Sequence, residues 1–115
     1  MDVNYRDAAE RLGWKVYEDD SGVVEFEKYS PAGEDFIFSI EGIKDPYDEV
    51  VGYLSDYDPD YHAEELIYFR HEGRARGNMR GIPSCEVCVQ DAKDILDMIC
   101  ELANAFREVS HAKGL

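Results

Sequence analysis

The sequence has no long apolar run, no basic start and few cysteines, and each of these gaps argues against a class of protein. No stretch of about 18 apolar residues is present, so no membrane-spanning helix is expected. The first residues, Met1-Asp2-Val3-Asn4-Tyr5, lack the basic and apolar segments of a secretory signal. Three cysteines cannot all pair with one another, which favours a reducing compartment over a disulfide framework. We therefore expect a soluble, cytoplasmic protein.

Basic residues are also scarce. The 115 residues include 12 lysines and arginines against 26 aspartates and glutamates, a formal net charge of −14 at pH 7. Residues 1–69 alone hold nineteen acidic and five basic side chains, whereas residues 70–80 hold four arginines and one glutamate. A negative field of this size repels nucleic acids and membrane surfaces and attracts basic partners. Solubility alone would also account for the charge, so composition leaves both interpretations open.

The first forty residues predict a helix followed by strands. Residues 5–13 form a short helical pattern, with Asn4 as the expected N-cap and Gly13 at the expected end. Apolar and polar residues then alternate in three segments separated by turn residues, namely residues 14–18, 24–27 and 36–40. This alternation predicts three strands in an antiparallel meander that has one apolar and one solvated face.

The rest of the chain predicts helices. Asp45-Pro46 and Asp58-Pro59 each predict a helix start, because aspartate is a good N-cap and proline suits the first helical position. The second of these helices is expected to end near Gly73 or Gly77. Ser84 is the expected cap of a C-terminal helix of about 26 residues, in which apolar side chains recur every three or four positions. That apolar stripe contains Cys88, Ala92, Ile95, Ile99, Leu102, Phe106 and Val109.

Together these elements predict an α+β fold. A three-stranded antiparallel meander packs against a long C-terminal helix, with a short N-terminal helix and two middle helices beside them. The length and a hydrophobic content of 44% suit one acidic domain over residues 1–115, which needs neither a disulfide nor a metal to fold.

Residues 56–60 (Asp-Tyr-Asp-Pro-Asp) resemble the opening of a calcium-binding loop, which places oxygen ligands at alternate positions. Such a loop also needs glycine at its sixth position and glutamate at its twelfth, where this chain has Tyr61 and Ile67. Acidic side chains that complement the dipole of a helix N-terminus are the better interpretation.

The cysteines contain one two-residue spacing, Cys85-Glu86-Val87-Cys88. A redox site is expected after a βαβ pattern, and a zinc site needs a second ligand pair, which Cys100 and a histidine would have to supply. Cys88 and Cys100 fall near the apolar stripe and are explained as buried apolar residues. Whether the three cysteines do more than this is left open.

Three acidic segments hold groups suited to acid–base chemistry if they line one pocket: residues 33–35, 60–62 and 64–65. They contain Glu34, His62 and several other carboxylates, but nothing in the sequence brings them together. No nucleophile elbow, phosphate-binding glycine loop or HExxH motif is present. We therefore expect no enzyme, no catalytic residue, no metal and no cofactor.

Several short motifs carry a resemblance to a known group of proteins. They are Ser30-Pro31-Ala32-Gly33-Glu34-Asp35-Phe36, Asp58-Pro59-Asp60-Tyr61-His62, Gly81-Ile82-Pro83 and Asp91-Ala92. From Trp14 onward the chain resembles small acidic uncharacterised proteins of phages and conjugative elements of gut bacteria, often encoded near antirestriction genes. Their pattern reads S/T-P-A-G-E-D-F/W, then DxDxH, then GxP. The dense arginines at 70, 74 and 76 depart from it. The resemblance implies an accessory protein of a mobile element and an inhibitor of host defence.

The charge and the resemblance together predict a protein that binds a basic surface, with no direct contact to nucleic acid or membrane. Its carboxylates would occupy the nucleic-acid channel of a defence nuclease in place of phosphates, as in inhibitors of the anti-CRISPR or antirestriction type. The expected partner-binding residues are Glu25, Glu27, Glu34, Asp35, Asp48, Glu49, Asp56, Asp58, Asp60, Glu64, Glu65, Arg70, Arg74 and Arg76.

Two alternatives stay open. The chain would be a self-associating regulatory or structural module if residues 70–80 dock on the acidic face of a second copy, giving a homodimer. It would be a small metal-binding or redox protein if His62, residues 56–60 or the cysteines bind an ion or react.

Overall fold

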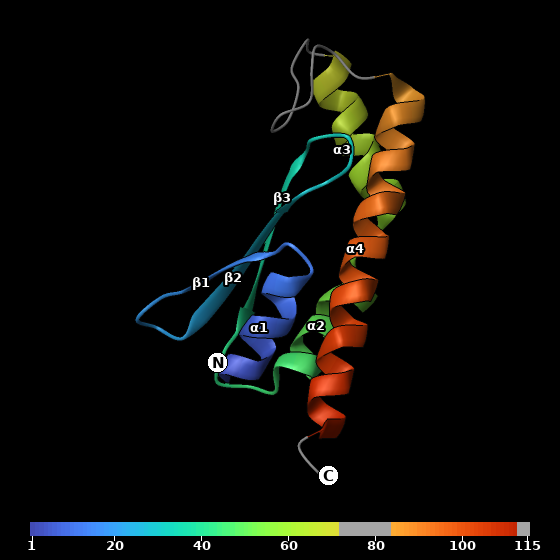
Figure 1. Ribbon diagram of the computed structural model, residues 1–115. Coiled ribbons are helices and arrows are strands. Elements are labelled where there is room, and N and C mark those ends of the chain that lie inside the picture. The colour runs from blue at the N-terminus through green and yellow to red at the C-terminus, as the bar shows by residue number, and fades with distance from the viewer. Residues whose placement is uncertain (72–83, 113–115) are drawn as a thin grey trace. The chain divides into compact units, whose positions relative to one another are not determined.

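The computed structural model describes residues 1–71 and 84–112, and these ranges contain four helices and a three-stranded sheet (Figure 1). The elements are, in chain order, α1 (Val3–Arg11), β1 (Lys15–Glu18), β2 (Val23–Tyr29), β3 (Asp35–Glu41), α2 (Pro46–Asp56), α3 (Pro59–His71) and α4 (Cys85–Ala112). The predicted α+β class and order of elements are confirmed. Within the described ranges, no helix combines the length and the apolar character that a bilayer crossing requires.

The chain divides into two compact units, each built from separate segments of sequence. Unit 1 consists of Met1–Lys28, Ile37–Asp56 and Ile99–Leu115, and unit 2 of Tyr29–Phe36 and Tyr57–Met98. The helix α4 contributes residues 85–98 to unit 2 and its remaining residues to unit 1.

Helix α1 begins earlier than the sequence pattern predicts. Asp2 is the N-cap, because its side chain accepts a hydrogen bond from the backbone N–H of Asn4 at 2.8 Å. The prediction that Asn4 caps the helix is therefore wrong, and Asn4 lies inside the first turn. Gly13 follows the C-cap residue with φ of +93°, a left-handed conformation that favours glycine and turns the chain into β1.

The sheet has the predicted antiparallel meander, with strand order β1-β2-β3. Strands β1 and β2 pair with Lys15 opposite Glu27 and Glu18 opposite Val24. In the turn between them, Asp19 Oδ1 accepts hydrogen bonds from the Ser21 backbone and hydroxyl at 2.8 and 2.6 Å. Alternate residues of β2 and β3 are buried, as the period of two requires.

Unit 1 has an aromatic core between the sheet and its helices. The Phe26 ring of β2 lies 5.9 Å from the Phe106 ring of α4 and 5.2 Å from the Phe38 ring of β3. Trp14 is 2% exposed and meets Phe38 edge-on at 5.6 Å, and Tyr5 of α1 meets Phe106 at 5.0 Å. The predicted packing of the meander against the C-terminal helix is confirmed in this unit.

The remaining helix starts follow the predicted caps. Asp45 Oδ1 accepts from the Tyr47 N–H at 3.1 Å at the start of α2, and Asp58 Oδ1 accepts from the Asp60 N–H at 2.9 Å at the start of α3. Ser84 Oγ accepts from the backbone N–H of residue 87 at 3.2 Å, and α4 runs for 28 residues from there. Each cap satisfies backbone donors that the first helical turn leaves without an internal partner.

Candidate functional site

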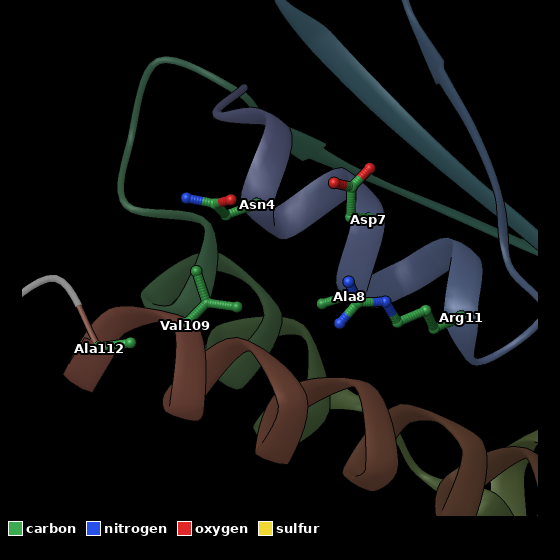
Figure 2. A pocket seen from close by; sticks show the side chains of 6 residues that line it. All are labelled: Asn4, Asp7, Ala8, Arg11, Val109 and Ala112. Carbon is green, nitrogen blue, oxygen red and sulfur yellow. The ribbon is translucent and has the colours of Figure 1, made fainter.

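A surface pocket in unit 1 lies between α1 and the end of α4, with a volume of about 290 Å³ (Figure 2). Asn4, Asp7, Ala8, Arg11, Val109 and Ala112 line it. Its polar groups are one acid, one base and one amide, which do not make a nucleophile with an adjacent base or a set of metal ligands. The stronger candidate site lies in unit 2 and begins at the turn before β3.

That turn folds back on Ser30 and directs Glu34 inward. The Ser30 N–H donates to the Glu34 carbonyl oxygen at 2.8 Å, and the Glu34 N–H donates to the Ser30 hydroxyl at 3.0 Å. Gly33 closes the turn by donating to the Ser30 carbonyl at 2.9 Å, with φ of +98°. As a result Glu34 is completely buried, at 0% exposure.

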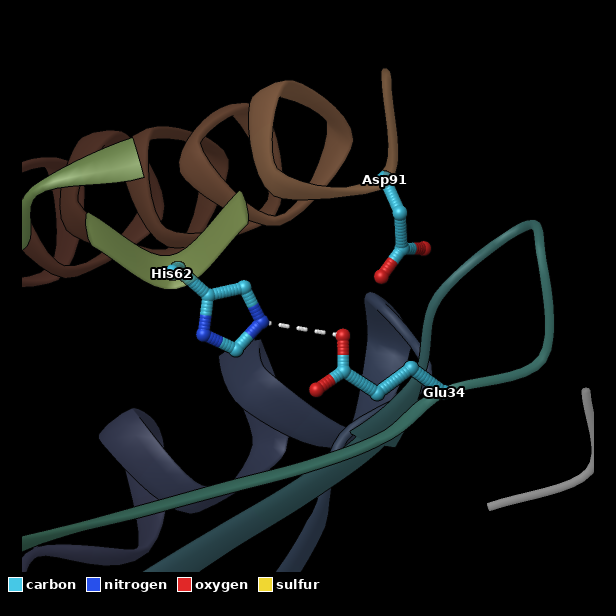
Figure 3. Close-up of side chains that lie close together, drawn as sticks. All are labelled: Glu34, His62 and Asp91. Atoms are coloured by element: carbon cyan, nitrogen blue, oxygen red, sulfur yellow. Dashed lines mark hydrogen bonds and ion pairs between the residues drawn. The ribbon is translucent and has the colours of Figure 1, made fainter. Parts of the chain in front are cut away.

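Three elements bring their side chains together at Glu34. His62 comes from the first turn of α3 and Asp91 from the second turn of α4, and Figure 3 shows both directed at the Glu34 carboxylate. His62 Nε2 lies 3.0 Å from Glu34 Oε2. One nitrogen or carboxylate oxygen from each residue lies within 4.8 Å of those of the other two. We refer to these three residues as the Glu34–His62–Asp91 cluster.

The cluster is shielded from solvent. Asp91 is 1% exposed, and the His62 side chain is 13% exposed. Phe36 and Tyr57 pack around the imidazole, with ring centres 6.2 and 5.7 Å from that of His62. Tyr57 also donates its hydroxyl to the carbonyl oxygen of residue 92 at 3.2 Å, which ties it to α4 beside Asp91. These aromatic contacts lower the local polarity and restrict the imidazole ring.

The electrostatics of Asp91 are strongly perturbed by its surroundings. Burial, and after it a hydrogen bond with the Glu34 carboxyl, raise the pKa of Asp91 from 3.8 to about 7. The Ser30 hydroxyl, which donates to Asp91 Oδ1, acts in the opposite direction. The two carboxyl groups hydrogen-bond each other only when one of them holds a proton, because ionised carboxylates are acceptors alone. A proton on Asp91 can therefore be donated to the Glu34 carboxylate.

The chemistry open to this cluster follows from its donor atoms. An imidazole nitrogen and two carboxylates can relay a proton, or can ligate a divalent cation. The sequence proposed Glu34 and His62 as members of an acid–base set, and the structure brings these two together. Asp60 and Glu64, from the same proposed set, are exposed on α3.

Sequence reasoning missed Asp91 as a site residue, although a signal was present. Asp91 stands three residues after Cys88 and four before Ile95, so it lies on the apolar face of α4. A charged residue inside an apolar stripe is almost never fully buried unless it has a partner. The sequence signal for the site is therefore the presence of an aspartate on an otherwise apolar helix face.

The expectation that Glu34 belongs to an exposed partner-binding surface is wrong, because the turn at Ser30 buries its side chain. The other acidic residues proposed for partner binding are at least partly exposed. Among them Asp48, Asp56, Asp58, Asp60 and Glu64 are exposed, and Glu25, Glu27, Asp35, Glu49 and Glu65 are half-buried. Arg74 and Arg76 lie outside the described residues, as does the side chain of Arg70.

The calcium-like segment and the cysteines have simpler structural roles. Asp58 Oδ1 accepts from the N–H groups of Asp60 and Tyr61 at 2.9 and 3.3 Å, so it caps α3 as the alternative interpretation predicts. Cys88 is buried as expected, whereas Cys85 is exposed and Cys100 is half-buried.

Comparison of the chain with protein-family models, with curated proteins and with solved structures finds no match.

Proposed function

We propose that this protein is a non-catalytic accessory protein that binds a basic protein surface through exposed carboxylates of α2 and of α3. Its target is the nucleic-acid channel of a nuclease, which the carboxylates occupy in place of phosphates. The resemblance to mobile-element proteins supports an inhibitor of a host defence nuclease as the specific form of this function.

One observation carries the proposal. Residues 45–69 contain eight carboxylates and no lysine or arginine, and all eight are at least partly exposed. They are Asp45, Asp48, Glu49, Asp56, Asp58, Asp60, Glu64 and Glu65. In the described part of the chain, ion pairs are formed by Glu18, Glu34 and Glu41, which lie outside this set. The carboxylates of Asp48, Asp56, Asp60 and Glu64 are therefore available to a partner.

Helix stability explains only part of this charge. Acidic residues at the starts of α2 and α3 complement the helix dipole, and Asp45 and Asp58 also cap the helices. Asp56 is the last residue of α2, where a negative charge opposes the dipole and costs about 0.3–1 kcal/mol. Asp60 and Glu64 are like charges four residues apart, which cost about 0.2–0.5 kcal/mol. Retaining unfavourable charges is consistent with a function outside the fold.

The exposed side chains between these acids also suit an interface. Tyr61 and Tyr68 of α3 are 67% and 56% exposed. Tyrosine is enriched at protein interfaces, because it combines a large apolar ring with a polar hydroxyl. Replacing phosphates on a basic surface also allows the carboxylates to release the same condensed counterions, which predicts salt-sensitive binding.

The test compares two variants of equal charge. The first removes helix carboxylates with D48N, D56N, D60N and E64Q. The second removes four exposed carboxylates from α1 and α4 with D7N, E10Q, E101Q and E108Q. Tagged proteins are used to capture partners from bacterial host lysate at low and high salt, with identification by mass spectrometry and competition by duplex DNA.

We expect the native protein to capture a basic nucleic-acid-binding enzyme at low salt, with displacement by DNA. The α2–α3 variant should bind it at least about 10-fold more weakly, and the matched variant nearly as well as the native protein. Equal loss in both variants, or recovery only of the protein's own copies, would contradict the proposal. The second result would favour self-association.

A further inference from the structure

The Glu34–His62–Asp91 cluster is independent of the exposed carboxylates of α2 and of α3, and it has the composition of a metal site. One imidazole and two carboxylates come from three separate segments of unit 2 and converge with donor atoms within 4.8 Å of one another. Two of the three side chains are at most 1% exposed, and the third is 13% exposed. Surface carboxylates gather by chance, but two carboxylates and a histidine that are buried together need a compensating charge.

A second observation concerns one oxygen of Asp91. Ser30 donates its hydroxyl to Oδ1, whereas the buried Oδ2 receives no hydrogen bond from any donor in the described ranges. A buried carboxyl oxygen without a hydrogen-bond partner is costly, because no water replaces the lost solvation. Figure 3 shows the Asp91 carboxylate directed into the space that Glu34 and His62 also face. An electron-pair acceptor in that space would satisfy the oxygen.

We propose that Glu34, His62 and Asp91 bind one divalent transition-metal ion of the Zn²⁺ type. With a neutral imidazole, two carboxylates balance the charge of the ion, so the buried assembly is neutral. The imidazole nitrogen selects a transition metal over Ca²⁺ and Mg²⁺, which prefer oxygen ligands.

The distances suit such an ion after a small expansion. Zinc binds nitrogen and carboxylate oxygen at about 2.0–2.2 Å, so two ligands in tetrahedral geometry stand about 3.3–3.5 Å apart. His62 Nε2 and Glu34 Oε2 are 3.0 Å apart, a few tenths of an ångström closer. The Ser30 hydroxyl donates to Asp91 Oδ1 and so orients this carboxylate at the site.

The ion has a structural role in this arrangement. It links the Ser30–Glu34 turn, the start of α3 and the first half of α4, which hydrogen bonds and side-chain packing within unit 2 also hold together. Ligands that are buried to this degree leave the metal shielded, as in sites that stabilise a fold. Binding therefore raises the stability of the folded protein.

The experiment measures metal binding directly. Full-length protein is treated with EDTA, desalted and titrated with ZnCl₂ by calorimetry, and its thermal unfolding is recorded with and without Zn²⁺. We expect one Zn²⁺ per chain and a higher Tm with zinc. The variants E34Q, D91N and H62Q should each weaken binding by more than about 100-fold, beyond the loss typical of outer-shell partners.

Two controls separate this site from other zinc-binding groups. H111Q removes an exposed histidine of α4, and C85S with C100S removes two thiols; both should bind zinc like the native protein. Bound Co²⁺ should show visible d–d bands without an intense ultraviolet thiolate charge-transfer band. If a carboxyl variant fails to fold by circular dichroism, H62Q decides, because His62 is the least buried ligand.

Three results would overturn the proposal. They are absence of stoichiometric zinc binding to the native chain, retention of binding in a folded H62Q or D91N variant, and a cobalt thiolate band that disappears with C85S. The last result would place the metal at the cysteines. The first would show that the buried cluster exists without a bound metal.

Discussion

Unit 1 and unit 2 bury different chemistry. Unit 1 is centred on aromatic rings, with Phe26 and Phe106 both at 0% exposure and Trp14 at 2%. Among the described residues, every buried polar or charged side chain belongs to unit 2, namely Ser30, Glu34 and Asp91. Both units also contain buried aliphatic residues. They differ in the other side chains that they bury, which are aromatic in unit 1 and polar or charged in unit 2.

Apolar burial and buried polar clusters contribute differently to a folded structure. Apolar burial contributes about 25 cal/mol per Å² of area and has little directional preference. A buried polar cluster contributes little net stability, because desolvation offsets its hydrogen bonds, yet it tolerates few alternative geometries. Retaining such a cluster where an apolar core would serve is the feature that points to a ligand in unit 2.

The largest expected loss of stability comes from a substitution in the aromatic core of unit 1. Phe106→Ala removes the ring that contacts both Tyr5 and Phe26, and it should lower the free energy of unfolding by about 3–5 kcal/mol. Urea denaturation monitored by circular dichroism measures this loss. Phe106→Leu, which keeps most of the volume, should cost much less. A loss below about 1 kcal/mol for the alanine variant would show that the core of unit 1 does not depend on this ring.

A second prediction concerns the pH dependence of unit 2 in metal-free protein. The pKa of Asp91 is about 7 in the folded protein and 3.8 without the surroundings of the fold. At pH values between these two, the folded state therefore holds a proton that the unfolded state has released. Stability should therefore fall as pH rises from about 4 to about 7, by up to about 1.4 kcal/mol per pH unit, and level off above that range.

Asp91→Asn should remove this contribution. The amide can still accept from Ser30 and can donate to Glu34 without a titrating proton, so the variant should gain stability over the native protein as pH rises to 8 in EDTA. Urea denaturation at several pH values measures the difference, with Asp7→Asn in unit 1 as a control that keeps the native slope. Parallel profiles for the native protein and D91N would contradict the assignment.

The smallest effect concerns an exposed carboxylate in unit 1. Hydrogen bonds from the Ser21 hydroxyl and the Val23 N–H lower the pKa of Asp19, whereas burial raises the pKa of Asp91. Ser21→Ala should move the pKa of Asp19 back toward 3.8, as measured by NMR titration of its carboxyl carbon. An Asp19 pKa that is unchanged by this substitution would show that the turn geometry, rather than the hydroxyl, determines it.

Local patterns predicted most of the fold because their causes are local. The caps at Asp45, Asp58 and Ser84 act over two or three residues, and the strand and helix periods act within single elements. The wrong N-cap predicted for α1 is also a local error. Asp2 and Asn4 are both good caps, and the choice between them moves the helix start by only two residues.

The candidate site was only half predictable. Glu34 and His62 were recognised as groups suited to acid–base chemistry, but Glu34 was also expected at the surface, because a glutamate in a turn is usually solvated. Its burial depends on the Ser30 hydroxyl and on packing against α3 and α4, which no local pattern records.

By itself, the sequence determined the order and type of the elements, the caps of α2, α3 and α4, the apolar faces and the excess of negative charge, because each depends on composition or on neighbours a few positions apart. Only the tertiary structure decided that residues 34, 62 and 91 meet. Each is about thirty positions from the next in sequence, and their contact exists only when a turn and two helices pack together. The polar centre of unit 2, and with it the proposed metal site, follows from that packing.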